Sequence, residues 1–124
     1  MQGFNDVLLR TMALVISSNG KMTDPEVVAV CEVYQRMTGD PIDDAAVLEH
    51  LRQAIVAGAD VRSFLQRHCA ELDVGERARL IEGVISGACA SGRIDRWQDW
   101  LLAEVAEPLG VSHDDVHAMV RAHL

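Results

Sequence analysis

A turn that occurs twice constrains the fold of this chain more than any other feature of its sequence. Asn19 to Glu26 and Ser91 to Gln98 each carry a glycine, an apolar residue two positions later, a helix-capping residue three later and Glu or Gln six later. A charge-poor apolar segment precedes each glycine, and an amphipathic segment follows each turn. Each stretch therefore predicts two helices joined by a tight turn, a unit that the chain uses twice.

Helical periodicity recurs along the chain and predicts about seven helices. We expect an all-α fold, a compact helical bundle in one domain that spans residues 1–124. The halves 5–56 and 74–124 are predicted to form an internal pseudo-twofold repeat of three helices each, linked by a further helix. The predicted helices span residues 5–18, 24–38, 44–56, 61–72, 74–90 and 96–109, with a last helix from Ser112 to about His123.

Capping residues mark the ends of these helices. Side chains that accept a hydrogen bond from the first turn stand at most of the predicted starts, and glycines stand at several ends. The predicted capping boxes pair Thr23 with Glu26, Asp73 with Glu76, and Asp95 with Gln98. The other predicted caps are Asp43, Asp60 and Ser112 at starts, and Gly39, Gly58 and Gly110 at ends.

Two glycines four residues apart, Gly83 and Gly87, lie inside the predicted helix 74–90. Glycine lowers helix stability, so its place there needs a reason. We favour a close crossing with helix 5–18, which is nearly apolar all round from Met12 to Ile16 and is expected at the centre of the bundle. A ligand pocket beside the two glycines is the functional alternative.

The formal net charge of −8 limits which classes of partner the chain can bind. Binding to nucleic acid needs clustered Lys and Arg that neutralise phosphates, and this sequence has no such cluster. We therefore expect no nucleic-acid partner, and cations or basic partners fit the charge better. Apolar residues make up 49% of the chain, enough for a packed core, so disorder is not expected.

Cysteine usage and the uncharged runs predict a cytoplasmic protein. Cys31, Cys69 and Cys89 are far apart and odd in number, which is typical of reduced thiols buried in a cytosol-like compartment. For Cys89, a buried structural role is favoured over a nucleophilic one. The chain begins without the basic start of a signal peptide, and its uncharged runs are too short to span a bilayer, so no membrane insertion is expected.

The doubled turn invites comparison with a calcium-binding helix-loop-helix hand. That loop needs several oxygen ligands and ends in a bidentate Glu. Glu26 matches the final ligand of the first turn, whereas Gln98 replaces it in the second, where Asp95 and Asp99 are the acids nearby. The favoured interpretation is a pair of helix-capping turns; a divalent-metal site at Glu26, Asp95 and Asp99 is the alternative.

The two halves resemble the TerB-like domains, which occur in tellurite-resistance proteins and at the N-terminus of DjlA-type DnaJ co-chaperones. The resemblance is clearest from Leu8 to Gly39 and from Leu80 to Val120. Asn19-Gly20 and Ser91-Gly92 stand where the family has Asp-Gly. The resemblance implies an all-helical domain with internal pseudo-symmetry that acts as an interaction module in stress-response or membrane-associated assemblies, with divalent cations at its acidic turns.

His113 and His117 form a second candidate metal site. Two imidazoles one helical turn apart can chelate a transition metal. The segment His113 to His117 also resembles the zinc-protease pattern His-Glu-x-x-His, with Asp in place of Glu and no third ligand evident. A solvated helix edge is the favoured interpretation of this pair.

Trp97 and Trp100, three residues apart, share one face of the predicted helix 96–109. We favour a place in the core, because the chain has few other aromatic residues to fill it. The alternative is a partner-binding pair on the surface, since aromatic residues are enriched at binding hot spots.

Three functional hypotheses follow. The leading one is a TerB-like protein-interaction module, stress or tellurite-resistance related, with no catalysis of its own and an unidentified protein partner. The second is a divalent-metal-binding protein, and the weakest is an accessory protein or enzyme of a biosynthetic pathway that uses the groove around Gly83 and Gly87. No cofactor is expected other than a divalent cation, and a homodimer is left open.

Overall fold

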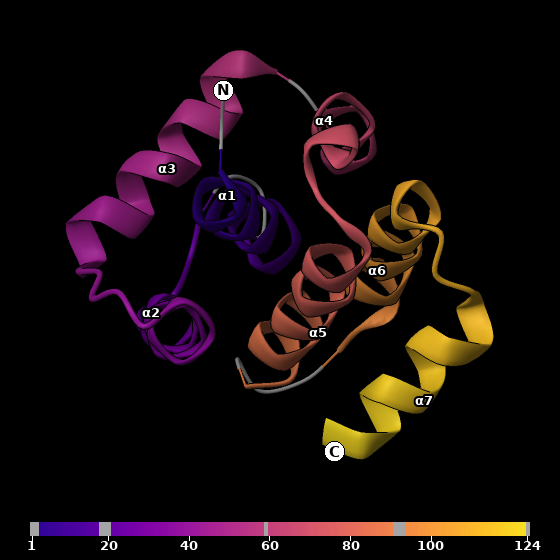
Figure 1. Cartoon of the computed structure of the whole chain (residues 1–124). Helices are drawn as coiled ribbons and strands as arrows, with labels where there is room; N and C mark the ends of the chain where they lie inside the picture. The colour runs from indigo at the N-terminus through magenta and orange to yellow at the C-terminus, as the bar shows by residue number, and fades with distance from the viewer. Residues whose placement is uncertain (1–2, 18–20, 59, 91–93, 124) are drawn as a thin grey trace.

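The computed structural model describes residues 3–17, 21–58, 60–90 and 94–123 and has the predicted all-α fold. Figure 1 shows the helices gathered around α1. A short 3-10 turn, η1 (Cys69–Glu71), follows the fourth helix. The α-helices of the described part are α1 (Phe4–Ile16), α2 (Asp24–Thr38), α3 (Asp44–Ala57), α4 (Val61–His68), α5 (Val74–Ala90), α6 (Arg96–Leu109) and α7 (His113–His123).

The predicted caps are present at the helix starts. In the capping box of α2, the Thr23 amide donates to Glu26 Oε1 at 2.7 Å, and the Glu26 amide donates to Thr23 Oγ1 at 3.3 Å. Asp73 and Glu76 make the same reciprocal pair before α5. Single side-chain caps open the other predicted starts at Asp43, Asp60 and Ser112. At Asp95 the carboxylate accepts from the Gln98 amide, which is one of the two bonds of the capping box predicted there.

Two helices end earlier than predicted. α1 stops at Ile16 because Ser17 takes an extended backbone, and the predicted end at Ser18 lies outside the described residues. α4 stops at His68 and tightens into η1. Arg77 donates from Nη2 to the carbonyl oxygen of Cys69 at 2.8 Å, and the same carbonyl accepts from the Leu72 amide at 3.1 Å.

α1 is the central helix, as predicted. It packs against α2, α3, α4, α5 and α6, and its side chains from Val7 to Ile16 are mostly buried. Its buried polar side chain, Thr11, donates from the hydroxyl to the carbonyl oxygen of Val7 at 2.6 Å. That bond stays within the helix, so the rest of the α1 surface is free to pack against aliphatic neighbours.

The close crossing predicted at Gly83 and Gly87 is confirmed. A Cβ atom built on Gly83 would lie 2.9 Å from Leu8 Cδ1, and one built on Gly87 would lie 3.0 Å from Ile16 Cδ1. Side chains of α1 therefore occupy the space beside both glycines. The alternative of a ligand pocket at this place is wrong, because packed hydrocarbon fills it.

α1 contacts α2 and α3, and α5 contacts α6 and α7, which is the pairing that an internal repeat requires. The pseudo-twofold relation itself stays a prediction. The glycines of the doubled turn, Gly20 and Gly92, lie outside the described residues, as do Asn19 and Ser91. Within the described part, no helix is long and apolar enough to cross a bilayer.

α6 lies between α4 and α7, whereas α3 lies at the opposite edge of the bundle (Figure 1). The buried face of α6, which includes Leu101, Leu102 and Val105, faces the core. The other face, together with α4 and α7, forms the surface considered next.

Candidate functional site

Trp97 and Trp100 lie on the surface, so the favoured prediction of a core position is wrong. Trp97 is 57% exposed and Trp100 is 50% exposed. The indoles stack on each other with ring centroids 5.0 Å apart and ring planes 22° apart. Aliphatic residues already fill the inward face of α6, so the wide indoles occupy the outward face. Tryptophan is highly buried on average, and a contiguous exposed apolar patch is typical of an interaction site.

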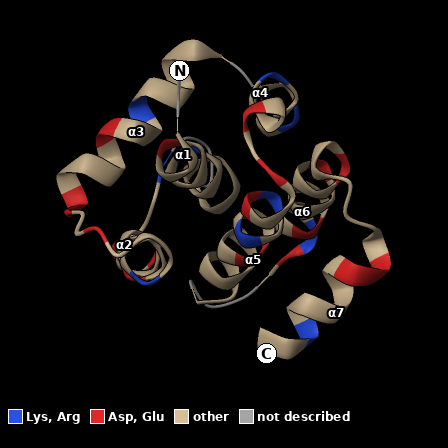
Figure 2. Cartoon of the chain, in the orientation of Figure 1, with Lys and Arg blue, Asp and Glu red and all other residues tan. Residues whose placement is uncertain are grey.

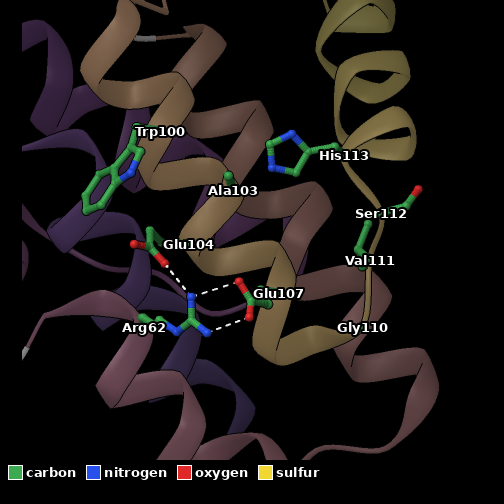
Figure 3. Close-up of a pocket in the computed structure, with 9 residues that line it drawn as sticks. All are labelled: Arg62, Trp100, Ala103, Glu104, Glu107, Gly110, Val111, Ser112 and His113. Atoms are coloured by element: carbon green, nitrogen blue, oxygen red, sulfur yellow. Dashed lines mark hydrogen bonds and ion pairs between the residues drawn. The ribbon is translucent and has the colours of Figure 1, made fainter.

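A groove of about 590 Å³ begins at Trp100 and runs between α6 and α7, with α4 at its rim. Figure 3 shows Trp100 and His113 on either side of Ala103, with the imidazole of His113 directed from α7 toward α6. The polar side chains of the groove come from α4, α6, the N-cap of α7 and α7 itself. The lining residues are Arg62, Trp100, Ala103, Glu104, Glu107, Gly110, Val111, Ser112 and His113.

Arg62 of α4 reaches across the groove to two carboxylates of α6 (Figure 3). Its Nη1 donates to Glu104 Oε2 at 3.1 Å and to Glu107 Oε2 at 2.8 Å. Its Nη2 donates to Glu107 Oε1 at 2.5 Å. The two carboxylates raise the pKa of Arg62 above its usual value, with Glu107 the larger cause. The guanidinium therefore stays charged and binds both carboxylate oxygens of Glu107 in a bidentate pair.

The two carboxylates differ in their access to solvent. The Glu104 side chain is 19% exposed and the Glu107 side chain is 63% exposed, with Arg62 between them at 38%. Glu107 therefore keeps an open side toward water while it binds Arg62. An aromatic face beside an accessible carboxylate is a surface suited to cations and to apolar groups that carry them.

His113 and His117 face each other in the first turns of α7. Their ring centroids are 5.9 Å apart, and His117 Nε2 lies 3.7 Å from Asp99 Oδ1 on α6. The structure thus brings three of the predicted metal ligands near one another. Zinc binds each imidazole nitrogen at about 2 Å. In the described part of the chain, no group of three or more His, Cys, Asp and Glu is arranged to hold a metal ion.

Glu26 and Asp95, the predicted ligands of the acidic turns, are used as helix caps. Glu26 Oε1 accepts from the Thr23 amide at 2.7 Å, and Asp95 Oδ1 accepts from the Gln98 amide at 2.8 Å. Each carboxylate thus satisfies an amide at the start of its helix. Whether either one also binds a cation stays a prediction.

The cysteines are only partly buried, whereas the sequence analysis predicted buried thiols. Cys31, Cys69 and Cys89 are free thiols at intermediate positions. Burial raises the pKa of Cys31, with Asp44 adding to the effect, and burial raises the pKa of Cys89. A raised pKa keeps a thiol protonated at neutral pH, so the favoured structural role of Cys89 agrees with its surroundings.

Arg62, Glu104 and Glu107 were missed by the sequence reasoning. The spacing of Glu104 and Glu107 places them on the same face of α6 as the tryptophans, and that much could have been derived from the sequence. Arg62 precedes them by about forty residues on another helix, so only the packing of α4 against α6 brings it there.

A smaller groove of about 380 Å³ lies at the start of α2 and along α3. Its apolar walls are open to solvent, since Leu48 and Ile55 are both exposed. None of its described lining residues is aromatic or carries a carboxylate. Its lining residues are Lys21, Met22, Leu48, Leu51, Arg52 and Ile55.

Comparison with protein families matches residues 5–121 to the family described as tellurite resistance protein TerB. The match covers the first predicted half, the linking helix and the second half as far as Arg121. No curated protein and no solved structure gives a significant match to the chain.

Proposed function

Because the chain belongs to the TerB family, which its match over residues 5–121 establishes, we propose that it is a protein-interaction module without catalysis of its own. The module is a single domain that acts in the cytoplasm in a stress response such as tellurite resistance. Its partner is a protein, and neither nucleic acid nor a membrane core takes part in binding.

The exposed indole pair on α6 carries this proposal. Burying large aromatic side chains on association gives more binding free energy than burying most other groups, and tryptophan is enriched at hot spots. Trp97 and Trp100 stack with half of their surface in water, so a partner can cover them without first unfolding any part of the domain.

The test is capture of partners from native lysate by the wild-type chain and by Trp97→Ala and Trp100→Ala variants. We expect the substitutions to lose the partner while the domain keeps its thermal stability, because the indoles contribute little to the core. Val56→Ala is the matched control, since Val56 is an exposed apolar residue on α3. Retention of every partner by both tryptophan variants would place the interface elsewhere.

A second proposal is divalent-metal binding at one of the two predicted sites, either Glu26, Asp95 and Asp99 or the pair His113 and His117. The imidazoles of that pair have ring centroids 5.9 Å apart. Glu26 and Asp95 remain candidates only if a cation can displace a capping bond. Calorimetric titration of the wild-type chain with calcium, magnesium and zinc tests this proposal, with His117→Ala as the comparison. The absence of heat at millimolar metal would end it.

A further inference from the structure

The outward face of α6 carries an aromatic end and an acidic end in one stripe. Trp97, Trp100, Glu104 and Glu107 follow one another at helical spacings of three and four, which place them on one face of the helix. Trp100 and the two carboxylates line the same groove. A segment that covers this stripe must therefore offer an apolar group to the indoles and a cation to the carboxylates about one to two turns away.

The chain already contains one ligand of this acidic end. Arg62 binds Glu104 and Glu107 through its guanidinium, and it comes from a different helix. This contact establishes that the carboxylate pair accepts a guanidinium in the available space. It also leaves Glu107 accessible to a second cation from solvent, because most of its side chain stays exposed.

The charge around the groove favours a basic occupant. Residues 94–123, which form α6 and α7, contain six Asp and Glu but only two Arg. Figure 2 shows acidic residues in the first turn of α7. They follow His113, which lines the groove. A second copy of the chain would bring its own net charge of −8 to this surface, whereas a basic segment would be attracted to it.

We propose that the groove between α6 and α7 receives a basic segment of a partner protein, with an apolar side chain on the Trp97–Trp100 pair and an Arg or Lys at Glu107. Arg62 competes with that cation for the same carboxylates. The inference rests on the proposed interaction role of the tryptophan surface and adds the chemistry of the partner.

The probe is a synthetic amphipathic peptide of leucine and arginine, about 18 residues long, so that it can form roughly five helical turns. The matched peptide has glutamate at every arginine position. Trp97 and Trp100 are the two tryptophans of the sequence, so intrinsic fluorescence reports on this site directly. We expect the arginine peptide to shift the emission, the glutamate peptide to leave it unchanged, and added salt to weaken binding.

Two substitutions of the same ion pair make the test specific. Glu107→Gln and Arg62→Gln both break the Arg62–Glu107 contact. If this ion pair served only the structure, both substitutions would change the affinity for the peptide in the same direction. Competition predicts opposite effects. Glu107→Gln should weaken peptide binding about threefold, and Arg62→Gln should strengthen it about threefold, the change expected of one exposed ion pair.

A distant pair controls for net charge. Glu49 and Arg52 form an exposed ion pair on α3, so Glu49→Gln changes the net charge as Glu107→Gln does but lies outside the groove. We expect Glu49→Gln to leave the affinity unchanged. An equal loss with Glu49→Gln and Glu107→Gln would mean general attraction only and would overturn the inference.

The inference and the proposed function fail separately. If the tryptophan variants lose their lysate partner but the arginine peptide does not bind, or Arg62→Gln and Glu107→Gln change its affinity in the same direction, the inference is overturned and the interaction role stands. If the tryptophan variants keep every lysate partner, the interaction role falls, and with it the inference.

Discussion

At the scale of single residues, His50 on α3 is a half-buried base, and its buried Nδ1 has no hydrogen-bond partner among the described residues. Burial lowers the pKa of His50, and the positive charge of Arg10 lowers it further, while Asp6 and Glu49 act in the opposite direction. The folded chain therefore binds a proton at this ring less readily than the unfolded chain, whose histidine has a pKa of about 6.5.

The pKa of His50 predicts a loss of stability in acid. Between the lowered pKa of the folded state and about 6.5, the unfolded state holds more protons, so the free energy of unfolding falls as the pH falls through this window. Urea denaturation of the wild-type chain and His50→Gln at pH values of about 7.5 and 5.5 measures the effect. The wild-type chain should lose more stability than the variant; equal losses would assign the acid sensitivity to other groups.

At the scale of elements, the crossing of α1 and α5 depends on glycine. Gly83→Ala should destabilise the domain by about 1 kcal/mol, because overpacking costs about 1–3 kcal/mol and the gain from removing glycine is about 0.4–1 kcal/mol. Leu8, which faces Gly83, is fully buried and has little room to move away. Thermal or urea denaturation gives the change in the free energy of unfolding.

Gly75 of the same helix is the matched control. A Cβ atom there would lie 3.4 Å from Asp73 Oδ1, an ordinary contact. Gly75→Ala should therefore stabilise the domain by about 0.4–1 kcal/mol. If both substitutions stabilised the domain, the crossing would have room for a methyl group, and close packing would not explain Gly83.

The elements were predicted well where their signals are local. The start of α2 depends on Thr23 and Glu26, which lie in one turn, so the sequence alone identifies it. The end of α4 was predicted too late, because the 3-10 turn at Cys69 depends partly on Arg77 of the next helix. Helical spacing grouped Trp97 with Trp100 correctly, but only the packing of α6 decided which side faced water.

At the scale of the whole molecule, the core joins the two predicted halves. α1 belongs to the first half and α5 to the second, and the two helices pack directly against each other. Figure 1 places them together at the centre of the bundle. Neither half can bury its central helix alone, so stability should belong to the complete chain.

A single domain predicts one unfolding transition. Scanning calorimetry of the full chain should give a calorimetric enthalpy equal to the van't Hoff enthalpy, as expected of a two-state domain of this size. Fragments 1–58 and 73–124 should each lack cooperative melting by circular dichroism. A fragment that melted cooperatively on its own would mean that the chain contains two domains.

The central position of α1 also has a consequence during protein synthesis. α1 is the first helix of the described chain, yet its packing partner α5 ends at Ala90. Ribosomes add about 5–20 residues per second, so roughly 4 to 15 seconds separate the completion of these two helices. For that time the nascent chain exposes α1, its most apolar helix, before α5 has been made. α2 and α3 are the first neighbours that can pack against α1 and cover its apolar surface.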